Sequence, residues 1–167
     1  TGCVIENLSI TNSAFIGSTT GDSGRMGSFV AYAAGGTFKN LYSDAILTNS
    51  ALVAGGILGL TDGENTVSNC WFDGDIYSTS DGGNLRGAGI IGWVFNGPVT
   101  VEHCLNTGSI QSNASAGQGP QQGGLIGYIE KSTVEINDCL NTGLVTTAGA
   151  TAQVSTLIGR NTTNATT

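Results

Sequence analysis

Three of the four cysteines recur at almost constant spacing, because Cys70, Cys104 and Cys139 follow one another at intervals of 34 and 35 residues. Equivalent thiols in one column would point the same way, which disfavours a disulfide, and a metal site needs ligands that converge. The sequence has no Cys-x-x-Cys motif. The pattern therefore predicts a buried ladder of free thiols that behave as small hydrophobic side chains, with Cys3 apart from it.

Histidine and carboxylate chemistry is the next candidate. His103 directly precedes Cys104, so alternation along a strand places the two side chains on opposite faces and argues against a Cys–His nucleophile. Asp73 and Asp75 flank a glycine, where carboxylates serve a turn, weak Ca²⁺ binding or acid–base cleavage of a glycoside. We assign no catalytic residue, no metal and no cofactor, and calcium at Asp73 and Asp75 is the one alternative.

Candidate ligand contacts come from one aromatic column and from the segments between repeats. The aromatic column faces a ligand if it points outward and joins the core if it points inward. The segments 79–87 and 113–122 vary between repeats and fall at one edge of the predicted fold, where insertions often form a binding surface. The candidate ligand-binding residues are Trp93, Tyr128, Gln118, Gln121, Gln122 and Arg86.

An internal repeat must position all of these residues. Similar stretches begin at Ala54, Gly87 and Gly123, and a weaker copy begins at Gly27. Fixed columns recur with a period near 30 residues, so one repeat is one supersecondary unit whose loops absorb the variation in length. Identical columns recur once per repeat rather than in mirrored pairs, which disfavours an array of hairpins.

Each repeat is predicted to hold three short strands separated by turns, as at 125–129, 133–140 and 144–147. Glycine and β-branched residues are abundant, whereas helix formers are scarce. The sequence therefore predicts an all-β fold, a right-handed parallel β-solenoid (β-helix) of about five coils with three short strands per coil. This domain covers residues 1–160, and a Thr/Asn-rich tail or linker follows at 161–167.

A glycine column also follows the repeat. A position without a side chain in every coil predicts close packing against a neighbouring strand. Ala31 takes this place in the weaker copy. The predicted structural glycine ladder consists of Gly59, Gly92, Gly127 and Gly159.

The segments GGILG (55–59), AGIIG (88–92), GGLIG (123–127) and STLIG (155–159) resemble the GLUG motif, a Gly-Leu-hydrophobic-Gly signature. The stretches that follow them, such as VTVEHCLNTGSI and VEINDCLNTGLV, resemble the rest of that repeat. GLUG repeats occur in large secreted or surface-attached bacterial proteins, including adhesins and some immunoglobulin A peptidases. The resemblance implies a module of a bacterial cell surface or of the extracellular space, and it implies no catalytic activity.

Charge and hydropathy exclude several other classes. Five basic residues against twelve acidic ones, with a net charge of −7, cannot neutralise a nucleic-acid backbone or form a polybasic membrane patch. No apolar run reaches the roughly 18 residues that a membrane-spanning helix needs. We therefore expect a stiff spacer and adhesin whose partner is a host glycan or protein, without nucleic-acid binding or membrane insertion.

Two alternatives to the adhesin stay open. The sequence begins and ends in mid-repeat, and the two half-repeats are complementary. This arrangement fits a piece of a longer array, and it also fits a self-assembling extracellular filament subunit that stacks head to tail. The other alternative is a carbohydrate-active β-helix enzyme, which would need converging carboxylates.

Overall fold

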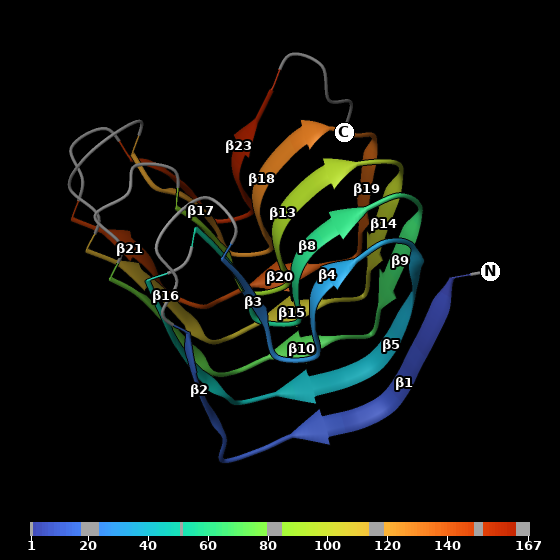
Figure 1. Ribbon diagram of the computed structural model, residues 1–167, viewed down its shortest axis with the longest axis horizontal. Helices are drawn as coiled ribbons and strands as arrows, with labels where there is room; N and C mark the ends of the chain where they lie inside the picture. The colour runs from blue at the N-terminus through green and yellow to red at the C-terminus, as the bar shows by residue number, and fades with distance from the viewer. Residues whose placement is uncertain are drawn as a thin grey trace.

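The computed structural model describes residues 2–17, 24–50, 52–79, 85–113, 119–148 and 152–162. Every element in these ranges is a β-strand, and the strands stack in parallel as a β-solenoid of about four turns (Figure 1). The all-β solenoid predicted from the repeat is therefore confirmed. The turns number about four rather than five, because the strands at either end of the stack form partial turns.

The strands follow one another turn by turn. The first partial turn holds β1 (Cys3–Ile10) and β2 (Ala14–Gly17). The next turn holds β3 (Arg25–Gly27), β4 (Val30–Ala33), β5 (Gly36–Ser43) and β6 (Ile46–Asn49). It is followed by β7 (Val53–Gly55), β8 (Leu58–Asp62), β9 (Asn65–Ser68), β10 (Trp71–Phe72) and β11 (Asp75–Ser78). Then come β12 (Arg86–Ala88), β13 (Ile91–Asn96), β14 (Val99–Glu102), β15 (Leu105–Asn106) and β16 (Ser109–Ser112). The last full turn holds β17 (Gln121–Gly123), β18 (Ile126–Lys131), β19 (Val134–Asn137), β20 (Leu140–Asn141) and β21 (Val145–Thr147), before β22 (Gln153–Ser155) and β23 (Ile158–Asn161).

Four parallel sheets run along the stack. Sheet A contains β1, β5, β9, β10, β14, β15, β19 and β20, and sheet B contains β2, β6, β11, β16 and β21. Sheet C contains β3, β7, β12, β17 and β22, and sheet D contains β4, β8, β13, β18 and β23. Each strand pairs with its equivalents one turn away, so the register reproduces the columns of the sequence. Ile76, for example, lies between Leu47 and Ile110.

Each turn bends more often than the sequence predicted. The single strand predicted at 133–140 is divided into β19 and β20 at Asp138, which adopts a left-handed backbone with φ of 51°. Strand β17 adds a further segment where a loop was predicted. A full turn such as β17 to β21 therefore carries five short strand segments rather than three.

The bend between the two halves of sheet A has the same left-handed backbone on every turn. Its residues are Asn7, Asn40, Asn69, His103 and Asp138, with φ between 51° and 59°. Asn and Asp adopt this conformation at lower cost than most residues. The Asn40 side-chain amide also donates to Asn7 Oδ1 at 2.7 Å, which links successive turns.

The interior between the sheets is filled by columns of hydrophobic side chains. Fully buried members include Phe38, Leu47, Val67, Phe72, Ile76, Val101 and Ile110. Burial of one such side chain contributes about 1.5–3 kcal/mol to folding. Repetition of similar residues in a column, as at Leu47, Ile76 and Ile110, lets successive turns present similar surfaces to each other.

The interior narrows where sheet C meets sheet D. Gly56 and Gly89 lie at this elbow, and a Cβ on Gly56 would collide with the ring of Phe72 on sheet A. A Cβ on Gly89 would collide in the same way with Asn106. Because no side chain separates them, the elbow and sheet A touch, and the chain folds inward between β3 and β4 (Figure 1). Sheets C and D therefore meet at a re-entrant angle on the outside of the solenoid.

Candidate functional sites

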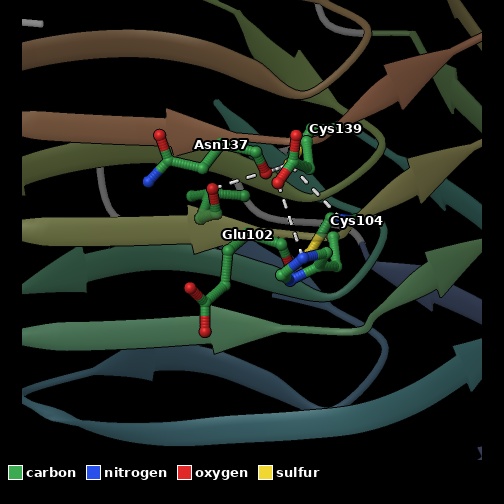
Figure 2. A network of polar contacts seen from close by, with 7 residues as sticks. Glu102, Cys104, Asn137 and Cys139 are labelled. Carbon is green, nitrogen blue, oxygen red and sulfur yellow. Dashed lines mark hydrogen bonds and ion pairs between the residues drawn. The ribbon is translucent and has the colours of Figure 1, made fainter.

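The thiol ladder lies at the bend that precedes β10, β15 and β20. Cys70, Cys104 and Cys139 are all free thiols; the first two are buried and the third is partly buried. Figure 2 shows Cys104 and Cys139 on neighbouring turns, where the Cys104 N–H donates to Cys139 Sγ at 3.3 Å. The Cys139 thiol donates to the Asn137 carbonyl at 3.2 Å, and Cys104 donates to the Glu102 carbonyl at 3.3 Å. The two thiols thus donate to carbonyl groups two residues earlier in the chain, and each of these carbonyls also accepts a backbone N–H group from the preceding turn.

Burial and mutual contact set the thiol pKa values. Contact with Cys104 lowers the pKa of the Cys70 thiol. Contact with Cys139 lowers the pKa of Cys104, but the neighbouring Cys70 and burial outweigh it and raise that pKa to about 12. Contact with Cys104, followed by burial, raises the pKa of Cys139. Because the thiolate is the reactive form, Cys104 and Cys139 are poor nucleophiles at neutral pH.

His103 occupies the left-handed bend and is exposed, whereas Cys104 is buried. Its Nε2 lies 3.6 Å from Asp138 Oδ2, and the two side chains are 57% and 79% exposed. A contact between side chains this exposed contributes little to stability. The contact links neighbouring turns as the Asn40–Asn7 pair does.

The glycine column lies where sheet D turns away from sheet C. A Cβ on Gly92 would lie 2.8 Å from backbone atoms of Ala54 and Gly59, one turn earlier, and Gly127 meets the backbone of Gly92 in the same way. Ala31 shares the column, and it is exposed because the described residues place no earlier turn of sheets C and D against it. Glycine is therefore needed only where one turn rests on another. Gly159 continues the column in β23.

Sheets C and D each present one outward column to the re-entrant angle. In every turn the residue on sheet D follows its counterpart on sheet C by seven positions. The pairs are Arg25–Tyr32, Val53–Leu60, Arg86–Trp93, Gln121–Tyr128 and Gln153–Arg160. Val53 and Leu60 are each 1% exposed, although neither belongs to the main hydrophobic cluster. The angle is therefore a second packed region outside the solenoid interior.

Three of the predicted ligand-binding residues meet in this angle. The Arg86 guanidinium lies 3.8 Å from the centre of the Trp93 ring and 4.8 Å from that of Tyr128. Trp93 and Tyr128 stack along the column with ring centres 6.2 Å apart, and Tyr128 is 7% exposed. A cation over an aromatic face contributes about 0.5–2 kcal/mol. Because the guanidinium covers the rings, this cluster is packed rather than open to a ligand.

The structure corrects the placement of two predicted loop residues. Gln121 and Gln122 lie in strand β17 and are both fully buried. Neither side-chain amide has a hydrogen-bond partner in the part of the chain that the structure describes. The loop-edge interpretation is wrong for these two residues, because the strand of sheet C begins earlier than the Gly-rich composition of the segment indicated. Gln118 lies outside the described residues.

The two carboxylates considered for calcium lie on the outer surface. Asp73 accepts a hydrogen bond from the Thr107 hydroxyl, and Asp75 accepts one from the Ser109 hydroxyl, each one turn later. Within the described ranges, no three His, Cys, Asp or Glu side chains cluster as a metal site would require. The contacts therefore link adjacent turns, and calcium at this position stays a prediction.

One aromatic pair on the outer surface is not among the candidate ligand-binding residues. Tyr42 and Trp71 pack edge to face on the outside of sheet A, one position after the thiol column, with ring centres 5.0 Å apart at 64°. Burial and then the charges of Asp44 and Asp73 raise the pKa of the Tyr42 phenol. The sequence indicates the outward orientation of this column, because residues one position after an inward-facing column must point outward.

Comparison with known protein families, curated proteins and solved structures gave no match. Within the described ranges, no helix could span a membrane.

Proposed function

We propose that this chain is a non-catalytic repeat module of a bacterial cell surface or secreted protein, where it acts as a stiff spacer and as an adhesin toward a host glycan or protein. The continuity of all four sheets carries the proposal. Every strand pairs with equivalents one turn away, so backbone hydrogen bonds run along the axis on every face of the stack. Such a stack keeps its ends at a fixed separation.

The two kinds of packing support the spacer. Hydrophobic columns fill the interior, and the Arg86 cluster fills the re-entrant angle between sheets C and D. With packing on both sides, these two sheets resist bending relative to each other. Contacts between turns on the outer surface, such as Thr107 with Asp73, add links along the axis.

The spacer and the adhesin are tested separately. Small-angle scattering should give one particle of constant mass and constant shape across concentration, and growth into rods would favour the filament alternative instead. For adhesion, the chain displayed on beads is tested for saturable binding to arrays of host glycans and extracellular-matrix proteins. Saturable binding to a defined member is expected, and binding to none would overturn the adhesin while leaving the spacer to the scattering result.

A further inference from the structure

A stripe of hydrophobic side chains runs along the outside of sheet A, on the column that follows the thiols. Its members are Tyr42, Trp71, Leu105 and Leu140. Trp71 remains 41% exposed although Tyr42 lies beside it, and Leu140 is 57% exposed. A large aromatic ring in this position presents apolar surface to solvent from a rigid strand rather than from a loop.

Oriented polar groups accompany the exposed ring. The Trp71 indole N–H donates to Thr107 Oγ1 at 2.7 Å, and the Thr107 hydroxyl in turn donates to Asp73 Oδ1. This chain of bonds fixes both the indole and the carboxylate. Asp73 is exposed, and its second oxygen accepts no hydrogen bond within the described residues. The fixed indole ring of Trp71 is therefore accompanied by a carboxylate, that of Asp73, whose position is also fixed.

We infer that this stripe binds a neutral pyranose glycan, with a sugar ring on Trp71 and a sugar hydroxyl donating to Asp73. The inference rests on the proposed adhesin and names its ligand class. The face of an aromatic ring is negative, so it attracts the slightly positive C–H groups on one face of a pyranose. Apolar contact supplemented by a few placed polar groups is the usual composition of a small-molecule site.

Charge selects among glycans. Asp44 and Asp73 both lie close enough to Tyr42 to raise the pKa of its phenol, and the whole chain carries a net charge of −7. Carboxylates accept hydrogen bonds from sugar hydroxyls but repel sialic acid and sulfate groups. The ligand therefore carries no sialic acid or sulfate group. Trp93 is not an equivalent platform, because Arg86 already covers its ring.

The test uses oligosaccharides terminating in glucose, galactose, mannose or N-acetylglucosamine, with sialylated and sulfated counterparts as the charged set. The chain has two tryptophans, so its ¹⁵N spectrum contains two indole N–H signals. A neutral glycan should shift the Trp71 signal and leave the Trp93 signal in place. The Trp71→Ala variant should bind about tenfold more weakly or worse.

Controls separate the site from general effects. Tyr77 is an exposed aromatic on sheet B, 37% accessible, and Tyr77→Ala should leave affinity within about twofold. Asp73→Asn keeps the shape of the site and should weaken neutral glycans while improving tolerance of sialylated ones. Binding that survives Trp71→Ala, in a variant that unfolds at the wild-type temperature, overturns this inference and leaves the adhesin intact. If no neutral glycan binds, the inference is overturned as well. Binding of a matrix protein alone would still support the proposed adhesin.

Discussion

The solenoid interior and the re-entrant angle are packed by different rules. Several interior columns keep one chemical type from turn to turn, as Val67, Val101 and Ile136 do. The column of Phe72 is an exception, because Ser43 and Asn106 are its neighbours on the adjacent turns. In the angle, a hydrophobic pair in one turn is followed by a cation on an aromatic ring in the next, at Arg86 and Trp93. Hydrophobic columns of this kind pack similar side chains along the axis, whereas the angle also accommodates pairs of different chemistry on neighbouring turns.

This difference also separates fixed parts of the fold from adjustable ones. An interior residue contacts its own column above and below, so a change in one turn disturbs two others. In the angle, Arg25 is matched with Tyr32 of its own turn at 5.1 Å, and the Arg86 guanidinium contacts Trp93 of its own turn and Tyr128 of the next. Four predictions test the contrast, beginning with the contact that joins the two regions.

The largest effect is expected at the glycine column, which lies between the interior and the angle. Gly127→Ala places a Cβ against the backbone of Gly92 and Gly87, which cannot move without shifting a whole turn. We expect a loss of about 5 kcal/mol in the free energy of unfolding, or failure to fold. Ala31→Gly in the same column is the control and should cost less than about 1 kcal/mol, from backbone entropy alone. Near-equal losses in urea titrations of the two variants would contradict this explanation of the glycine column.

A matched pair of truncations compares the two regions directly. Phe72 is fully buried in the interior, so Phe72→Ala should cost about 4 kcal/mol through lost transfer energy and a cavity. Trp93 is partly exposed and packs against flexible Arg86, which can follow the smaller side chain. We therefore expect Trp93→Ala to cost about 2 kcal/mol despite the larger side chain. If chemical denaturation gives the reverse order, the angle is the stronger of the two regions.

Alkaline pH should weaken the interior through the thiol ladder. The Cys104 pKa rises from 9.0 to about 12 on folding, so the folded state holds a proton that the unfolded state releases. Its stabilisation is complete below pH 9 and is lost as pH rises toward 12. Between pH 9 and 11 the wild type should lose about 2 kcal/mol more than Cys104→Ala, measured by urea unfolding. Parallel pH profiles for the two proteins would show that Cys104 makes no such contribution.

The smallest expected effect is a gain in the free energy of unfolding. The Gln121 amide is buried without a hydrogen-bond partner among the described residues, so Gln121→Met removes an unsatisfied group at similar volume and should add about 1 kcal/mol. Gln111 donates to Ser109 Oγ at 3.3 Å, and Gln111→Met serves as the control, with no gain. Thermal unfolding of both variants measures the difference. A loss at Gln121 would mean that its amide has a partner in solution.

Repetition made the columns predictable. Equal spacing identifies residues that stack one turn apart, which is why the thiols and the glycines of sheet D fell into the register that the sequence predicted. Spacing along the chain does not indicate how sharply each turn bends between columns. Two bends were therefore not predictable from the repeat: the one at the left-handed Asp138, which divides 133–140, and the elbow at Gly56.

The candidate site was only partly predictable for a related reason. Arg86, Trp93 and Tyr128 stand out by composition and column, but their mutual contact depends on the angle between sheets C and D. Gln121 and Gln122 were placed on a loop because polar residues after Gly and Pro are typical of loops, and tertiary packing overrode that preference. Trp71 was not selected as a ligand-binding residue, because its column lies away from the glycine motifs that define the repeat.

Because each strand pairs only with equivalents one turn away, the solenoid also has a defined response to mechanical load. A force along the axis acts in line with the hydrogen bonds of the outermost turn, and that turn can detach while the next one keeps all of its own bonds. Equivalent cysteines lie 34 residues apart along the chain. One detached turn then supplies roughly 110 Å of extended chain in place of about 4.8 Å of stack. A tether built from such turns is stiff at low force. Under a higher force it lengthens in large steps of about one turn each, which limits the tension on any molecule attached to it.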